Sequence, residues 1–80
     1  MRTVLLYETQ GCGLCAETFR QLSRVSLDTA IEIIRVDIAT DPGLFQRYAL
    51  RVPVIATSGR ELDAAGVSES ALRAFVAASP

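Results

Sequence analysis

The sequence predicts a small α/β domain, with elements in the order β-α-β-α-β-β-α and a four-stranded mixed sheet flanked by three helices. Three observations support this prediction. Short apolar runs of strand length alternate with segments whose apolar residues recur at helical spacing. The 80 residues contain no internal repeat, low-complexity tract or linker. A chain of this length has room for one hydrophobic core, so we expect a single domain over residues 1–80.

The first half of the chain has the pattern of a βαβ unit. Residues 3–7 (TVLLY) form a continuous apolar run, which ends at the polar loop of residues 8–11. From 13 to 26, apolar side chains recur on one face of a helix. Residues 31–38 (IEIIRVDI) are mostly β-branched and apolar, so we expect a buried strand there.

The second half predicts a short helix followed by a hairpin. Asp41 and Pro42 have the pattern of an N-cap followed by proline in the first helical position. Residues 51–56 (RVPVIA) predict a strand interrupted by Pro53, and after a turn residues 61–63 predict a brief partner strand. The expected buried side of the short helix consists of Leu44, Phe45 and Tyr48.

The last element is predicted to be a helix that begins after Ser68. Serine is a favoured N-cap residue, because its hydroxyl accepts a hydrogen bond from an amide of the first helical turn. Apolar residues follow at helical spacing and predict one buried face. That face consists of Ala71, Leu72, Phe75 and Val76.

Charge and hydropathy exclude several classes of partner. Eight basic and nine acidic residues give a net charge of −1, without the basic stripe that nucleic-acid binding needs. No apolar stretch approaches the roughly 20 residues that span a bilayer, and no signal-peptide pattern precedes the first strand. We therefore expect a cytoplasmic protein that binds neither nucleic acid nor membrane. We also expect it to be a monomer. In that compartment a cysteine pair is catalytic, redox-sensing or metal-binding more often than structural.

The only two cysteines, Cys12 and Cys15, lie in the sequence GCGLC, where the first strand gives way to the first helix. Unpaired amides and the helix dipole favour a thiolate at a helix N-terminus, so we expect a lowered pKa for Cys12 and assign it as the nucleophile. Cys15 lies one turn inside the helix on its buried face, which suits a resolving thiol. Gly13 leaves room for a substrate, and Leu14 offers it an apolar contact.

Other interpretations of the pair remain open. A structural zinc site usually takes four nitrogen or sulfur ligands, whereas this chain has two cysteines and no histidine, so zinc would need a shared site in a dimer. A structural disulfide would close a very short loop and remove little unfolded-state entropy. The two residues could also be buried bystanders. A rival function is a non-enzymatic module that binds a protein partner or a metal through its cysteines.

Together, Cys12-Gly-Leu-Cys15 and the later Val52-Pro53 make the chain resemble the thioredoxin superfamily. Its size and element order look like those of glutaredoxins, and its local sequence resembles that of a short bacterial glutaredoxin-like group. The resemblance implies a thiol-disulfide oxidoreductase. It also implies that the peptide bond before Pro53 is cis and that Pro53 faces the two cysteines. A cis bond would also explain a proline inside an apolar strand-like run. The Val52 backbone would then be free to pair with an extended peptide or glutathione.

The chain also departs from the glutaredoxin pattern. Gly13-Leu14 replaces the Pro-Tyr that familiar glutaredoxins carry between their cysteines, and no lysine precedes the pair. Their glutathione-binding glycine motif is matched only in part, before the last helix. We predict that glutathione, if it binds, is held by its carboxylates. The predicted contacts are the amides of Ser68 and Glu69 and the side chains of Arg47 and Arg51.

The predicted substrates are disulfides of proteins or mixed disulfides of glutathione. Glutathione or a thioredoxin-reductase-type partner would then reduce the oxidised cysteine pair. The prediction requires no metal and no tightly bound organic cofactor.

Overall fold

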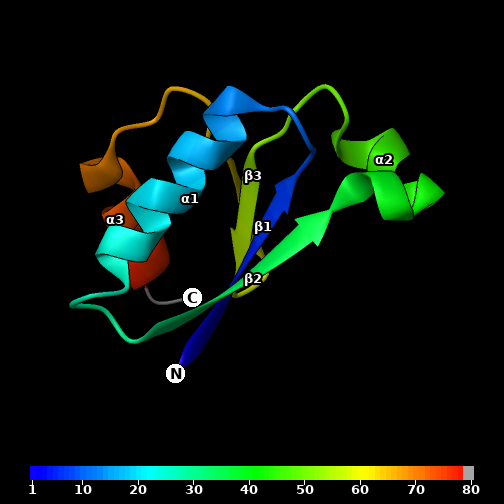
Figure 1. The fold of residues 1–80 in the computed structure, drawn as a ribbon. Coiled ribbons are helices and arrows are strands. Elements are labelled where there is room, and N and C mark those ends of the chain that lie inside the picture. The colour runs from blue at the N-terminus through cyan, green and yellow to red at the C-terminus, as the bar shows by residue number, and fades with distance from the viewer. Residues whose placement is uncertain (79–80) are drawn as a thin grey trace.

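The computed structural model describes residues 1–78 and confirms the predicted order of elements (Figure 1). The described chain forms four strands, three α-helices and one short 3₁₀ turn. The strands are β1 (Arg2–Glu8), β2 (Ile31–Asp37), β3 (Val54–Thr57) and β4 (Arg60–Asp63). The helices are α1 (Gly13–Val25), α2 (Pro42–Tyr48) and α3 (Glu69–Ala77), with the 3₁₀ turn η1 (Ile38–Thr40) before α2.

The strands form one mixed sheet in the order β2-β1-β3-β4. β1 and β2 are parallel, with Glu8 opposite Asp37 at their carboxyl ends. β3 is antiparallel to β1, and Val54 at its start lies opposite Tyr7. The ends of β1 and β2 and the beginning of β3 therefore meet at one edge of the sheet. Open α/β sheets bind ligands at this type of edge, because the loops that leave the strands converge there.

The main hydrophobic core lies between the sheet and the helices α1 and α3, which cover the same face (Figure 1). A second, smaller cluster lies under α2 on the opposite face, where Tyr48, Ile38 and Val54 are buried. None of the helices in residues 1–78 is long and apolar enough to cross a membrane. The fully buried members of the main core are Val4, Leu6, Leu22, Val25, Ile55 and Leu72.

The predicted helix starts are confirmed by their capping geometry. The Asp41 carboxylate accepts hydrogen bonds from the amides of Gly43 and Leu44, at 2.8 and 3.2 Å, with Pro42 in the first turn. The Ser68 hydroxyl accepts a hydrogen bond from the Ala71 amide at 3.1 Å. Side-chain oxygens thus satisfy amides that a helix cannot pair internally.

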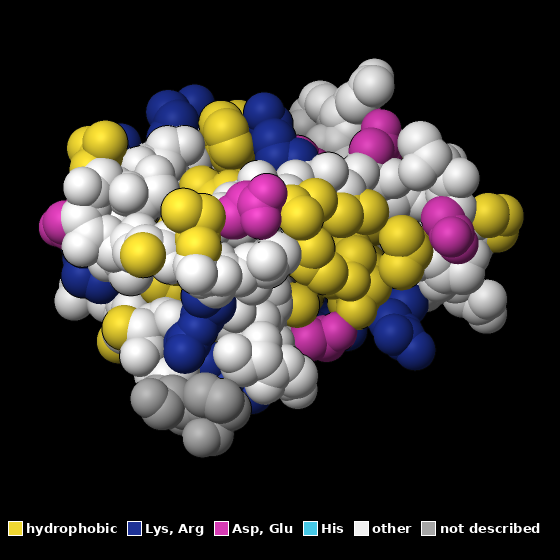
Figure 2. All heavy atoms as spheres, turned by 90° about the horizontal axis from the view of Figure 1, so that it is seen from below, with side chains coloured by type: hydrophobic (Ala, Val, Ile, Leu, Met, Phe, Trp, Pro, Cys, Tyr) yellow, Lys and Arg dark blue, Asp and Glu magenta, His cyan; other side chains and the backbone are white. Residues whose placement is uncertain are grey.

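Several details of the sequence prediction are wrong. The strand expected to be buried, β2, lies at the edge of the sheet, where it has a neighbouring strand on one side only, and its Ile34 is 41% exposed. Phe45 is 50% exposed, and Ala71 is also exposed. The interrupted strand begins only at Val54, after the proline. Figure 2, which views the molecule from below, shows apolar side chains gathered at the surface among charged ones.

Candidate active site

Cys12 is the N-cap residue of α1 and is half-buried. The loop that joins it to β1 turns at Gly11, whose φ of +72° is a conformation that glycine adopts without steric cost. The amide of Cys15 donates a hydrogen bond to the Cys12 Sγ at 3.1 Å. Because this amide belongs to the first helical turn, it and the helix dipole stabilise negative charge on the sulfur atom.

Cys15 lies inside the first turn of α1 and is only 1% exposed. The two cysteines are joined as a disulfide, and their Cα atoms are 5.2 Å apart. A reagent from solvent can therefore reach the sulfur of Cys12 but not that of Cys15. This difference in burial is the property that separates an attacking thiol from a resolving thiol.

Gly13 and Leu14 separate the two cysteines and face solvent. Leu14 is 54% exposed, so its side chain is available to an incoming molecule. A Cβ atom at Gly13 would meet no other atom within 4 Å, so the glycine is not needed for packing within the chain.

Val52 and Pro53 lie immediately before β3, at the edge of the sheet where β1 ends. Their peptide bond is cis in the structure. The Pro53 carbonyl accepts a hydrogen bond from the Ala64 amide at 2.8 Å, while the Val52 amide donates to the Tyr48 carbonyl at 3.0 Å. Since the Val52 amide already has a partner, a substrate strand would pair with Val52 through its carbonyl oxygen.

The two predicted arginines are held differently. Arg51 donates hydrogen bonds to Glu61 and Asp63, at 2.9 and 2.8 Å, and these carboxylates raise its pKa, with Asp63 contributing most. Its charge is therefore already neutralised within the chain. Arg47 is exposed on α2, with its guanidinium carbon 5.9 Å from the centre of the Tyr48 ring.

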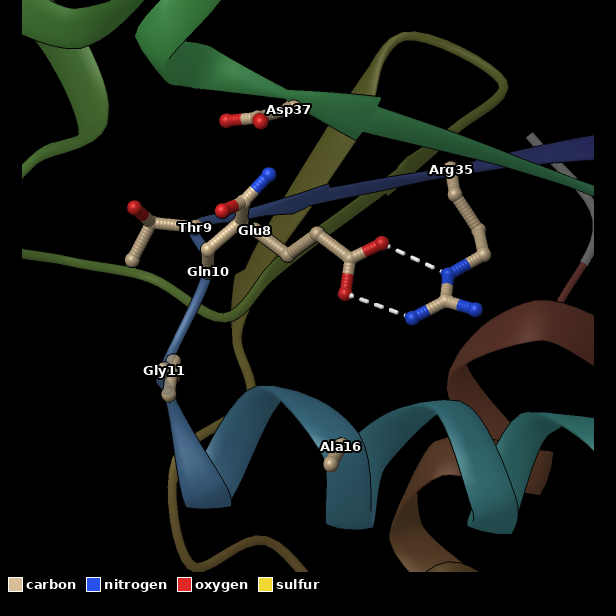
Figure 3. A pocket seen from close by; sticks show the side chains of 8 residues that line it. Glu8, Thr9, Gln10, Gly11, Ala16, Arg35 and Asp37 are labelled. Atoms are coloured by element: carbon tan, nitrogen blue, oxygen red, sulfur yellow. Dashed lines mark hydrogen bonds and ion pairs between the residues drawn. The ribbon is translucent and has the colours of Figure 1, made fainter.

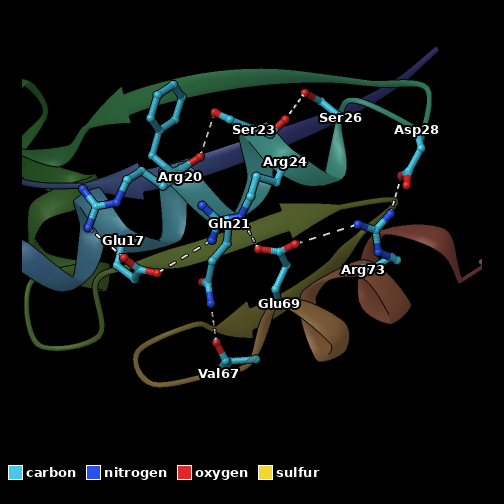
Figure 4. A network of polar contacts seen from close by, with 11 residues as sticks. Glu17, Arg20, Gln21, Ser23, Arg24, Ser26, Asp28, Val67, Glu69 and Arg73 are labelled. Atoms are coloured by element: carbon cyan, nitrogen blue, oxygen red, sulfur yellow. Dashed lines mark hydrogen bonds and ion pairs between the residues drawn. The ribbon is translucent and has the colours of Figure 1, made fainter.

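Val67, which precedes Ser68, and Glu69 contact the later turns of α1 rather than Cys12 (Figure 4). The Glu69 carboxylate accepts a hydrogen bond from Arg24 at 2.6 Å, and the carbonyl before Ser68 accepts one from Gln21 at 3.1 Å. Arg24 is about three helical turns from Cys12 along α1. The structure thus does not bring the start of α3 together with the cysteine pair.

The cavity beside Cys12 contains charged residues that sequence reasoning missed (Figure 3). It has a volume of about 260 Å³ and lies between the loop of residues 9–11, the side of α1 and the end of β2. Arg35 donates to both oxygens of Glu8, at 2.7 and 3.1 Å, and this pairing raises the pKa of Arg35. Asp37 also lines the cavity.

The sequence signal for this cavity is the polarity of the ends of the first two strands. Glu8 is the last residue of β1, and Arg35 and Asp37 close the strand predicted to follow. Because β1 and β2 are parallel, their carboxyl ends lie at the same edge as the loop that carries Cys12. Polar residues at those two strand ends were therefore candidates for a shared site.

Comparisons with known proteins agree with this fold. A thioredoxin variant from Halobacterium salinarum is 21% identical, with a TM-score of 0.69, and the match covers 94% of this chain and 71% of that one. A crystal structure of a structural-genomics target protein from X. campestris has a TM-score of 0.81 and 33% identity, over 96% of this chain and 99% of that one. The first similarity shows that the fold is thioredoxin-like.

Sequence comparison identifies the family. An uncharacterized protein of Mycobacterium tuberculosis is 31% identical over 81 aligned positions, which cover 95% of this chain and 84% of the relative. A family model described as "Glutaredoxin-like domain (DUF836)" matches residues 3–77, nearly the whole chain. The chain therefore belongs to the glutaredoxin-like domain family.

Proposed function

We propose that this protein is a thiol-disulfide oxidoreductase in which Cys12 is the nucleophile and Cys15 the resolving thiol. The observation that carries the proposal is the contrast between the two sulfur atoms. Cys12 is accessible and receives an amide hydrogen bond at the start of α1, whereas Cys15 is 1% exposed behind it. This arrangement suits disulfide exchange by a dithiol, because the first attack occurs at the surface and the second occurs within the protein.

The reaction consists of two exchange steps. The Cys12 thiolate attacks one sulfur of the substrate disulfide, a mixed disulfide forms, and the other substrate sulfur leaves as a thiolate that takes a proton from water. The Cys15 thiol then gives its proton to water, and the resulting thiolate attacks the Cys12 sulfur. This step forms the Cys12–Cys15 disulfide and releases the second substrate thiolate. Two electrons pass from the protein to the substrate.

The proposed substrates are protein disulfides and glutathione mixed disulfides, and the cytoplasm is the proposed compartment. Glutathione or a thioredoxin-reductase-type protein would return the two electrons, without a tightly bound cofactor, and the protein would act as a monomer. The exposed side chain of Leu14 favours substrates that offer an apolar contact beside their disulfide. We propose that Pro53 and the Val52 carbonyl border the opposite side of the substrate.

A turnover assay tests the proposal and identifies the electron donor. The protein is mixed with a disulfide substrate and NADPH, with either glutathione plus glutathione reductase or thioredoxin reductase. With one of the two donors, we expect NADPH to be consumed only when this protein is present. We expect this consumption to be lost in Cys12→Ser. Equal consumption by the wild type and by Cys12→Ser would contradict the proposal.

The rival function, binding of a metal or a protein partner through the cysteines, has a separate test. Among residues 1–78 there is no group of three or more metal-ligating side chains. Metal analysis of protein purified under reducing conditions without chelator is expected to give well under one zinc per two chains. A stoichiometric zinc content with sulfur ligands would favour the rival.

A further inference from the structure

The cavity beside Cys12 lies on the opposite side of that residue from Pro53. In the strand order β2-β1-β3-β4, Cys12 follows the central strand β1, the cavity is bordered by the end of β2, and Pro53 precedes β3. A peptide that crosses Cys12 from the Pro53 side would therefore place a neighbouring side chain over the cavity. The cavity can therefore discriminate between substrates by the chemistry of that side chain.

The charges that border the cavity do not cancel. Glu8 and Arg35 neutralise each other through two hydrogen bonds, and the Glu8 side chain is only 13% exposed. Arg35 also lies over the ring of Phe19, 3.9 Å from its centre, which fixes its position. Asp37 contributes one more negative charge, and no cation among residues 1–78 forms an ion pair with it.

The orientation of Asp37 leaves this charge available to a ligand. One of its carboxylate oxygens accepts a hydrogen bond from the Ala39 amide at 2.9 Å, which holds the side chain in place. Figure 3 shows the Asp37 carboxylate on the side of the Thr9–Gln10 loop, pointing away from Arg35. The cavity thus combines one fixed carboxylate without a cationic partner and an internally neutral Glu8–Arg35 pair.

We propose that this cavity is a specificity subsite for a basic side chain, a lysine or arginine within two positions of the substrate's reacting cysteine. This inference rests on the proposed function, since it assigns a peptide substrate to the same cysteine pair. Asp37 binds the cation. Glu8 acts as a positioning residue, because it neutralises Arg35 and so prevents that guanidinium from repelling the substrate.

Single-turnover reduction of matched peptides tests the subsite without any added electron donor. Each short peptide carries one cysteine, blocked as a mixed disulfide with 2-mercaptoethanol. A lysine, a leucine or a glutamate stands directly before or directly after that cysteine. Pre-reduced protein supplies two electrons per disulfide and becomes the Cys12–Cys15 disulfide. We expect the lysine peptides to react about threefold to fivefold faster than the leucine peptides, the range of a partly exposed ion pair, and the glutamate peptides to react most slowly. The preference should disappear in about 1 M salt, where charges are screened within about 3 Å.

Two variants assign the preference to the cavity. Asp37→Asn keeps an oxygen for the Ala39 amide and should abolish the preference for lysine. Glu8→Gln should lower it as well, because Arg35 is then no longer neutralised. The matched control is Glu32→Gln, which removes the same charge from an exposed position of β2 outside the cavity and should leave the preference unchanged.

The possible outcomes separate the subsite from the chemistry. Equal rates for the three peptides, or an unchanged preference in Asp37→Asn, would overturn the subsite while leaving the oxidoreductase proposal intact. If Glu32→Gln loses the preference for lysine as fully as Asp37→Asn does, the preference depends only on the net charge of the protein. That result would also overturn the subsite. If pre-reduced protein reduces none of the peptides, the proposed function fails and the subsite fails with it.

Discussion

At the scale of single residues, the two cysteines differ because three positions separate them at the start of a helix. Cys12 is the N-cap, outside the helix and half-buried, whereas Cys15 is one turn further and faces the core. The same local geometry gives Cys12 an amide hydrogen bond from Cys15. A partly exposed cysteine and a buried one therefore result from one strand-to-helix junction.

This difference predicts selective alkylation of the reduced protein. Iodoacetamide below pH 7 should modify Cys12 first, because its sulfur is accessible and its thiolate is favoured by the helix N-terminus, while Cys15 should react only on unfolding. Mass spectrometry of digested protein measures the two rates. As a control, both cysteines should react at similar rates in denaturant. Similar rates in the native protein would contradict the assignment of roles.

At the scale of elements, α2 is tied to the hairpin by a polar contact next to the second core cluster. The Tyr48 hydroxyl donates a hydrogen bond to Glu61 of β4, and Arg51 donates to the same carboxylate. The Tyr48 ring is also stacked on Tyr7, with ring centres 4.2 Å apart. These contacts hold the chain that leads from α2 to Pro53.

Removing the Tyr48 hydroxyl should therefore destabilise the protein. Tyr48→Phe leaves the ring in place but deprives Glu61 of a donor, and we expect a loss of about 1 kcal/mol in the free energy of unfolding. Urea denaturation followed by circular dichroism measures it. Tyr7→Phe is the matched control, since no hydrogen bond of the Tyr7 hydroxyl is found in residues 1–78, and it should cost less. Equal losses in the two variants would refute a role for the Tyr48–Glu61 contact.

The same contact predicts a pH dependence of stability. The Tyr48 hydroxyl, and then Arg51, lower the pKa of Glu61 in the folded protein below its ordinary value of 4.5. A carboxyl with a lowered folded pKa adds stability above its unfolded pKa and loses it as pH falls through the folded pKa. Wild type should thus lose stability more steeply below about pH 4.5 than Glu61→Gln. Parallel pH profiles of the unfolding free energy would contradict this linkage.

Elements whose formation depends on local sequence were predicted well. The pattern of β1 and α1, the cap residues Asp41 and Ser68, and the Cys12–Cys15 pair are local signals, and the structure has the elements where these signals place them. The position of a strand within the sheet depends instead on long-range pairing, so the exposed edge at β2 was missed. The cavity differs in this respect: it lies where the parallel strands β1 and β2 end in register, and the predicted βαβ unit already makes the polar residues at those ends candidates for a shared site.

At the scale of the whole molecule, one principal core supports the fold. An 80-residue domain buries a limited fraction of its surface, so each large core side chain contributes a substantial part of the net stability. Leu22 of α1 is fully buried in that core, together with Val4, Leu6 and Leu72. The face of α1 that anchors the helix therefore also fixes the position of the cysteines at its start.

Truncation of Leu22 should strongly lower the free energy of unfolding. Leu22→Ala removes buried methyl groups and leaves a cavity, which costs about 2–5 kcal/mol in comparable cores. Leu27→Ala, at a position that is 84% exposed, is the matched control and should change stability by no more than about 0.5 kcal/mol. Chemical denaturation of both variants checks the difference. A small loss for Leu22→Ala would show that this helix is not anchored as described.

The central claim, that Cys12 attacks a disulfide and Cys15 resolves the product, is tested most directly by trapping the mixed disulfide. Reduced Cys15→Ser is mixed with a disulfide-containing peptide, and intact-mass spectrometry with and without dithiothreitol detects the adduct. The account predicts a stable, dithiothreitol-sensitive adduct at Cys12 in Cys15→Ser, and none in Cys12→Ser, where the remaining thiol is buried. An adduct that forms equally well through Cys15, or no adduct through Cys12, would contradict it.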